Sequence, residues 1–208
     1  MKRKLVYSDI LRTVWKALLS QIWLLAGLTI GITIIISLLF IFAVPAKGET
    51  LRMSGIVVFA ICFFLCGIFY MGFLKNCFQT LDGEEAQFSA YGQVSRKIIE
   101  FIVAYIILSI IVFVGTLFLV IPGIYLALRL QFFVAAMVED NAGIFESLKR
   151  SWDITRGYTL DLFVLSLISI AIFMIGMIAF LAGIFVAAPM TELIYCATYR
   201  KLTSPIAT

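Results

Sequence analysis

Histidine is absent from this 208-residue chain, and only 13% of its residues are charged. Without histidine the chain lacks the most common general base and the most versatile metal ligand. A soluble domain carries roughly 25% charged residues, because it needs a polar shell. The four cysteines have no metal-ligand spacing and fit small apolar filling residues. We therefore expect no cofactor, no metal centre and no enzyme activity.

Apolar residues make up 63% of the chain, and its mean hydropathy is +1.11. A hydrocarbon layer about 30 Å thick is crossed by roughly 20 helical residues. Backbone groups in lipid must be satisfied within their own segment, so apolar runs of this kind form helices. We predict an all-α integral membrane fold of six transmembrane helices, at residues 22–44, 55–74, 98–120, 123–138, 160–180 and 184–199.

Basic residues outside these segments fall almost entirely on one side of the predicted membrane. If the six segments cross in alternation, only Lys47 and Arg52 fall on the other side. An excess of Lys and Arg marks the cytoplasmic side. The first apolar segment is longer than the core of about 7–15 residues typical of a signal peptide, so we interpret it as a span. We predict a multi-pass protein of the bacterial inner membrane with both termini in the cytoplasm.

Long and short connections alternate along the chain, which predicts three transmembrane hairpins. A charged amphipathic stretch precedes each hairpin on the cytoplasmic side, at 8–18, 88–97 and 144–154. We predict a single membrane domain, 1–208, built from three diverged units of an interfacial helix and a hairpin. Parallel repeats of this type recur in membrane proteins. The predicted units are 8–80, 86–140 and 141–202.

The third interfacial stretch has the clearest pattern. Ile144, Leu148 and Trp152 recur at four-residue spacing and so share one helical face. An interfacial helix places Trp at the membrane boundary and its basic residues toward anionic lipid. A helix that merely packs under the bundle would have the same pattern. The basic residues that we assign to the lipid-facing helix, together with Trp152, are Lys149, Arg150 and Arg156.

Two charges lie inside predicted spans. Arg129 and Glu192 are roughly 14 Å and 12 Å from the cytoplasmic ends of their helices, at about 1.5 Å per residue. A lone charge at such a depth costs at least about 2.5–3.5 kcal/mol. We therefore predict that the two residues form an intramembrane pair, with Gln131 and Thr191 as polar neighbours. The pair would serve as a structural clamp or as a substrate site, with Arg129 reading an anionic lipid head group in the second case.

Prolines mark two further positions. Pro122 and Gly123 are predicted to turn the chain between the third and fourth spans, where a short connection needs a helix stop and a flexible residue. Pro189 lies within the sixth span, where proline removes a hydrogen bond and kinks or breaks the helix. A broken helix marks many transporter sites, whereas a simple kink is a feature of packing.

One long block of the sequence resembles a known group of proteins. The block runs from Pro-Gly through a span with arginine (121–130) and an acidic pair (139–140) to a basic helix ending in glycine (146–157). With 81–85 and 199–202, it is similar to the membrane domain of bacterial glycerophosphoryl diester phosphodiesterases and to related uncharacterised six-span proteins. The resemblance covers most of residues 70–202. It implies the membrane architecture but not the activity, which in that family belongs to a separate domain with histidine and acidic metal ligands.

Two functions fit these features. One is a non-enzymatic protein that contacts lipid or serves as a membrane scaffold or subunit. The alternative is a small transporter or channel with a polar site around Arg129 and Glu192. The expected partners are membrane lipids, including anionic ones, a second copy of the chain or a membrane complex, and no nucleic acid. A polar cavity inside the bundle would favour transport, and a lateral apolar groove would favour lipid contact.

Overall fold

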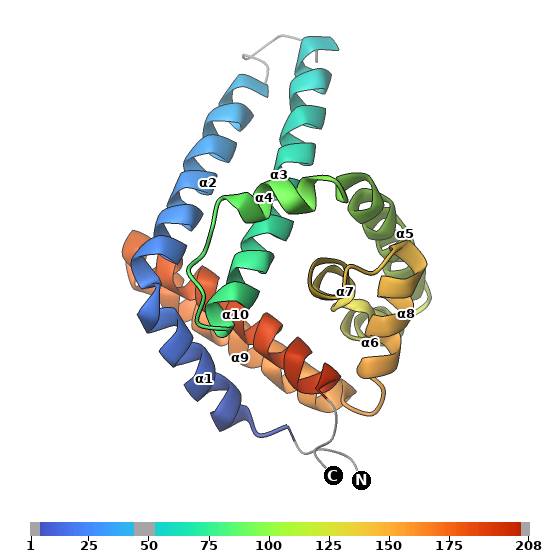
Figure 1. Ribbon diagram of the computed structural model, residues 1–208. Coiled ribbons are helices and arrows are strands. Elements are labelled where there is room, and N and C mark those ends of the chain that lie inside the picture. The colour runs from blue at the N-terminus through green and yellow to red at the C-terminus, as the bar shows by residue number, and fades with distance from the viewer. Residues whose placement is uncertain (1–4, 44–52, 205–208) are drawn as a thin grey trace.

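The computed structural model describes residues 5–43 and 53–204, and every secondary-structure element in these two ranges is a helix (Figure 1). The first expected span ends at Val44 and the expected outer loop holds Lys47 and Arg52, and these three residues lie outside the described ranges. The helices are α1 (Tyr7–Ser20), α2 (Ile22–Ala43), α3 (Met53–Leu81), α4 (Ser89–Ser95), α5 (Ile98–Phe118), α6 (Val120–Leu130), α7 (Phe133–Glu139), α8 (Ile144–Ile154), α9 (Thr159–Ile178) and α10 (Phe180–Thr203).

Within the described residues, four helical stretches are long and apolar enough to cross a membrane. A fifth is obtained if Tyr7–Ser20 and Ile22–Leu38, which meet at 81°, count as one broken span. Large apolar side chains on these helices are exposed, including Phe118 and Ile178, each at 81%. Apolar surface on this scale is typical of lipid-facing helices and not of a soluble monomer. The expected membrane class is thus supported at four or five spans, and the count of six stays a prediction.

Helix α10 lies at the centre of the packing and contacts α1, α2, α3 and α9. In Figure 1, α2 and α3 project as a pair beyond the other helices, while α5 to α8 gather on the other side of α3. Along the chain α2 packs on α3, α5 on α6 and α9 on α10. Each of these pairs joins two segments that we expect to form a hairpin. The division into three repeat units remains a prediction.

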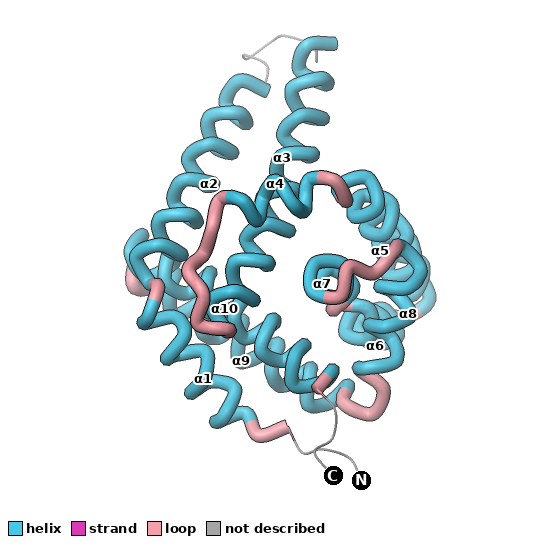
Figure 2. The backbone as a smooth tube through the Cα atoms, in the orientation of Figure 1, coloured by secondary structure: helices cyan, strands magenta, loops and turns pink. Residues whose placement is uncertain are grey.

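The corner between α1 and α2 is fixed by Gln21. Its side-chain amide donates to the carbonyl of Glu84, and its side-chain oxygen accepts a hydrogen bond of 3.0 Å from the backbone N–H of Ala86. Figure 2 shows the connection between α3 and α4, in pink, running past this corner. The backbone N–H of Gln87 in turn donates to the Asn76 side chain at 3.1 Å. One polar side chain at a helix break thereby holds a loop more than 60 residues away in the sequence.

Helix α1 packs on the bundle through Ile10, Val14 and Leu18, all of which are buried. Their four-residue spacing places them on one face, and this face lies against α10 and α3. The side chain of Tyr7 donates a hydrogen bond of 2.6 Å to Asp161 at the start of α9. The first and last predicted units are therefore joined directly at this end of the bundle.

The predicted turn at Pro122 and Gly123 is wrong in position, because the chain turns at Leu119, whose backbone is extended between α5 and α6. Pro122 lies in the first turn of α6, where its missing N–H has no helical partner to lose. Gly123 serves the packing of α5 against α6. A Cβ at this position would overlap the side chain of Thr116, so only glycine lets the two helices approach this closely.

Pro189 does not break its helix, because α10 continues through it from Phe180 to Thr203. Proline has no N–H, so the carbonyl of Phe185 loses its partner four residues later. The hydroxyl of Thr191 donates to the carbonyl of Ala188 at 2.8 Å. The predicted alternative of a broken helix at Pro189 is therefore not met.

Candidate functional site

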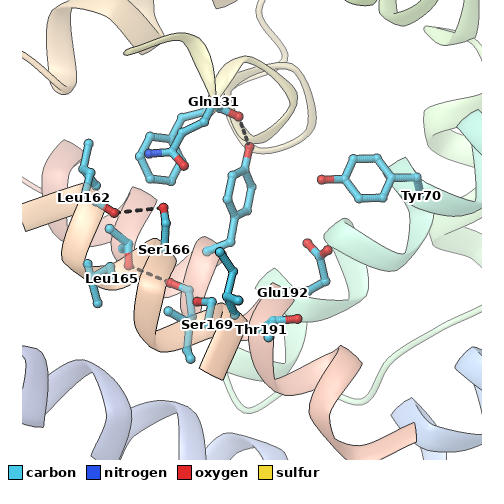
Figure 3. A pocket seen from close by; sticks show the side chains of 13 residues that line it. Tyr70, Gln131, Leu162, Leu165, Ser166, Ser169, Thr191 and Glu192 are labelled. Carbon is cyan, nitrogen blue, oxygen red and sulfur yellow. Dashed lines mark hydrogen bonds between the residues drawn. The ribbon is translucent and has the colours of Figure 1, made fainter. Parts of the chain in front are cut away.

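A polar cavity of about 240 Å³ lies between α3, α9, α10 and the junction of α6 with α7. Glu192 and Thr191 reach it from α10, Tyr70 reaches it from α3, and Gln131 reaches it from the α6–α7 junction. Figure 3 shows the carboxylate of Glu192 and the hydroxyl of Tyr70 directed into the same space. Ser166 and Ser169 of α9 complete the hydroxyl-rich wall. Three of the predicted site residues, Glu192, Gln131 and Thr191, are thus brought together.

Two larger cavities adjoin this polar one, and both share Tyr70 with it. A cavity of about 350 Å³ lies between α3, α5 and α7 and also includes Gln131. Another of about 330 Å³ lies between α2, α3, α9 and α10 and also includes Thr191 and Glu192. Both are lined mainly by aliphatic and aromatic side chains, such as Phe101 and Phe173. The arrangement is a polar centre with an apolar space on either side.

Glu192 has no basic partner among the residues that the structure describes. The ion pairs present there involve other residues. A carboxylate held among apolar helices at such a depth is costly, and intramembrane acids generally mark ligand or ion sites. Around Glu192 the cavity offers hydroxyl and amide groups, which accept hydrogen bonds from a cationic ligand. The chemistry of the cavity favours a ligand with a positively charged group.

The predicted pair of Arg129 with Glu192 does not form. Arg129 is 2% exposed, and its guanidinium carbon lies 4.1 Å from the ring centroid of Trp152 in α8 and 5.8 Å from that of Tyr125 in α6. It lines none of the three cavities around Tyr70. Similar depth in two helices does not set the direction in which the side chains point. The charge of Arg129 is offset by aromatic faces, and not by a carboxylate.

The junction between α6 and α7 fixes both Arg129 and Gln131. The predicted span 123–138 is interrupted here, because α6 ends at Leu130 and α7 begins at Phe133. The freed carbonyl of Arg129 accepts hydrogen bonds from the hydroxyls of Ser151 (2.9 Å) and Thr155 (3.0 Å). The Ser151 hydroxyl also accepts from the N–H of Phe132 at 3.0 Å. The backbone groups that lose their helical partners at the break thus find hydrogen-bond partners next to it, and the interruption is stabilised by these contacts.

Helix α8 packs on the bundle mainly through small hydroxyl residues. Ser147, Ser151 and Thr155 are fully buried, and Leu148 is 8% exposed, whereas Trp152 is 37% exposed. Small hydroxyl residues bring α8 close to the backbone of the α6–α7 junction, which needs hydrogen-bond partners. The interfacial position expected for Trp152 and its basic neighbours stays a prediction.

A cluster of charged residues closes one end of the bundle. Arg200 of α10 makes two hydrogen bonds to Asp82, just beyond α3, and pairs with Glu139 of α7 at 2.6 Å. Its guanidinium also lies over the ring of Phe78 at 5.2 Å. The hydrogen bonds from Arg200 hold the pKa of the Asp82 carboxyl below its usual value of 3.8. One arginine thus ties together α3, α7 and α10.

The cluster continues through Asp140, which accepts a hydrogen bond from the hydroxyl of Tyr199 and pairs with Arg150 of α8. Arg150 also donates to the Tyr199 hydroxyl at 3.3 Å. We call these residues the terminal cluster: Asp82, Glu139, Asp140, Arg150, Tyr199 and Arg200. They come from the short polar segments at 81–85, 139–140, 146–157 and 199–202, and nothing in the spacing of these segments indicates that they meet.

A family model for a domain of unknown function, DUF7847, matches residues 86–207, more than half of the chain. The chain belongs to this family. The match includes α4 to α10, so the α6–α7 junction, α8 and Glu192 lie within the DUF7847 region, whereas Tyr70 and Asp82 precede it.

The chain is also 28% identical to uncharacterized proteins of Mycobacterium tuberculosis (strain H37Rv) and Mycobacterium bovis over 160 residues. Each match covers 76% of this chain and 47% of the relative, so the chain spans about half the length of these curated relatives. No solved structure matches. The comparisons support an uncharacterised family, and the resemblance to phosphodiesterase membrane domains stays a prediction.

Proposed function

We propose that this DUF7847 protein is a non-enzymatic, multi-pass membrane protein that binds an amine-bearing membrane amphiphile around Glu192. The observation that carries this proposal is an unpaired carboxylate in a polar cavity flanked by two apolar cavities. An amphiphile has the same division into a polar head and apolar chains. We further propose a six-span topology in the bacterial inner membrane with cytoplasmic termini, in which α2 and α10 provide the first and last spans.

The three cavities have suitable dimensions for such a ligand. Their volumes of about 240, 350 and 330 Å³ compare with roughly 300–1,000 Å³ for small-molecule sites. A primary ammonium group next to Glu192 would supply the missing positive charge and could donate hydrogen bonds to Thr191 and Tyr70. The acyl chains would follow the apolar cavities, where Phe101 and Phe173 lie.

Native mass spectrometry of the protein extracted in mild detergent tests this proposal. The wild-type protein should retain phosphatidylethanolamine in preference to phosphatidylcholine, whose bulky quaternary head group donates no hydrogen bond. Glu192→Gln should abolish the preference, because the amide has the same shape but no charge. Glu100→Gln is the matched control, since Glu100 lies on a bundle helix, α5, but lines none of the three cavities. Equal retention of both lipids, or an unchanged preference in Glu192→Gln, would contradict the proposal.

Transport is the second candidate function, because Pro189 and the unpaired Glu192 lie within one turn of each other on α10. A proline in this position loosens the helix next to the acid. Uptake of radiolabelled methylammonium into proteoliposomes separates the candidates. Uptake that exceeds that of empty liposomes and is lost in Glu192→Gln would favour transport, and its absence alongside lipid retention would favour lipid binding.

A further inference from the structure

A stripe of exposed residues runs along α8 through Phe145, Lys149 and Trp152 and continues to Arg156 in the turn just after the helix. Spacings of four and three residues place the first three on one helical face. Phe145 is 76% exposed and Trp152 is 37% exposed. The stripe lies apart from the face formed by Ser147, Ser151 and Thr155, which packs against the bundle. Aromatic and basic residues therefore alternate along this stripe.

The basic residues of this stripe have no acidic partner. Among the described residues neither Lys149 nor Arg156 forms an ion pair, whereas Arg150, next to Lys149 in sequence, pairs with Asp140. The acids nearest in sequence are Glu146, three residues before Lys149, and Asp153, which lies between Lys149 and Arg156. Neither acid forms an ion pair with Lys149 or Arg156. Among the described residues, Arg150 is thus held in an ion pair, whereas Lys149 and Arg156 are two unpaired cations.

A third cation approaches the same stripe from inside the protein. The guanidinium of Arg129 lies over the ring of Trp152, and its Nε is buried with no hydrogen-bond partner within the described part of the chain. The hydrogen bonds from Ser151 and Thr155 to the Arg129 carbonyl hold the arginine backbone against α8. Arg129 is thereby positioned behind Trp152, while Lys149 and Arg156 flank that residue.

We propose that the surface around Trp152 binds the phosphate of an anionic membrane lipid. Lys149 and Arg156 contact the phosphate, the ring of Trp152 lies at the boundary between head groups and acyl chains, and Arg129 is a positioning residue that orients the ring and adds positive potential behind it. Arginine and lysine are the common partners of phosphate groups, and basic residues beside an interfacial aromatic residue are typical of anionic-lipid recognition. The site is separate from the Glu192 cavity and does not depend on the function proposed for it.

Fluorescence quenching at Trp152 tests the site directly in the full chain. Trp15 and Trp23 are exposed, so Trp15→Phe with Trp23→Phe leaves Trp152 as the sole tryptophan of the original three. The protein is placed in phosphatidylcholine nanodiscs containing a small fraction of either phosphatidylglycerol or phosphatidylcholine brominated on the acyl chains. Brominated phosphatidylglycerol should quench Trp152 more strongly at equal fraction, because it is enriched at the site.

Substitutions decide whether the stripe causes the enrichment. Lys149→Gln with Arg156→Gln should lower the apparent affinity for phosphatidylglycerol by roughly fivefold per removed cation. Arg12→Gln with Arg96→Gln removes the same charge from exposed positions on other segments and should leave the preference unchanged. Arg129→Gln should weaken the preference and Arg129→Lys should restore most of it, whereas a purely structural role for Arg129 would leave the preference intact in folded protein.

Three results would overturn the proposal. The first is equal quenching by the two brominated lipids. The second is an equal loss of preference in the Lys149/Arg156 pair and in the Arg12/Arg96 control pair, which would indicate attraction by net charge alone. The third is displacement of brominated phosphatidylglycerol by millimolar inorganic phosphate, which would assign the site to soluble phosphate and not to lipid.

Discussion

Two groups of charges in this protein have opposite surroundings. In the terminal cluster, Arg200 and Arg150 each reach an acid from another helix. Within the bundle, Arg129 and Glu192 have opposite charge but different neighbours: aromatic rings for Arg129 and an open polar cavity for Glu192. The cluster includes residues that follow or end helices, where side chains from several elements converge. Arg129 and Glu192 project from the sides of their helices, so the orientation of each helix about its own axis decides what the side chain contacts.

This difference indicates where binding should be sought. Paired charges in the terminal cluster already have their partners and connect α3, α7, α8 and α10. The two interior charges have no oppositely charged partner among the described residues, so each could still bind a ligand. Uncharged groups position Arg129: the hydroxyls of Ser151 and Thr155 bind its backbone carbonyl. The structural role and the binding role that the sequence suggested for one pair are thus divided between two sets of residues.

The largest expected effect comes from breaking the uncharged support of the interior. Ser151→Ala removes the hydroxyl that serves both the Arg129 carbonyl and the Phe132 N–H. Buried groups left without a partner cost about 1–3 kcal/mol each, and the partner offered by Thr155 reduces the loss at the carbonyl. We expect a destabilisation of about 2–3 kcal/mol, measured by denaturant unfolding in lipid bicelles. Ser109→Ala, which removes an exposed hydroxyl bonded within its own helix, should change stability by less than about 0.5 kcal/mol. Equal effects of the two substitutions would contradict a stabilising role for the Ser151 hydrogen bonds.

A smaller effect is expected from opening the terminal cluster. Arg200→Gln leaves Asp82 and Glu139 without their cation. Partly exposed ion pairs contribute little individually, but bidentate networks contribute more, so we expect a loss of about 1–2 kcal/mol in the same unfolding assay. Arg96→Gln, at an exposed position with no ion pair in the described chain, is the control and should be nearly neutral.

Acidification should reduce the difference between wild type and Arg200→Gln. The pKa of Asp82 is lower in the folded protein than its usual value of 3.8. Its contribution to stability is therefore complete above that value and is lost as the pH falls through the lower folded pKa. A gap between the two proteins that stays constant down to pH 2 would show that the Asp82 carboxylate contributes nothing.

The smallest expected effect is the coupling between the two interior charges. Because Arg129 and Glu192 have separate surroundings, the stability changes of Arg129→Gln and Glu192→Gln should add to within about 0.3–0.5 kcal/mol. The matching double-mutant cycle for Arg200→Gln and Asp82→Asn should show clear coupling. Coupling of 1 kcal/mol or more between Arg129 and Glu192 would contradict their separation and would indicate that the two residues interact.

The sequence by itself determined which segments are helical and apolar. All three short stretches expected before the hairpins are helices, and α8 matches its expected bounds at Ile144–Ile154. Hydrophobic runs and turn residues are local signals, so they place helices without any knowledge of the fold. Position along a helix is equally local, so the sequence predicts Arg129 and Glu192 within spans, with Gln131 and Thr191 as neighbours of that predicted pair.

Only the tertiary structure decided which side chains meet. The predicted ion pair failed because depth fixes one coordinate and rotation about the helix axis fixes the other. The interruption at Gln131 and Phe132 has no proline or glycine to signal it. It depends on the hydroxyls of Ser151 and Thr155, which donate to the Arg129 carbonyl, while the Ser151 hydroxyl also accepts from the backbone N–H next to it. The terminal cluster joins positions as far apart as Asp82 and Arg200. Such contacts arise from the packing of whole helices, and the spacing of residues along the chain does not encode them.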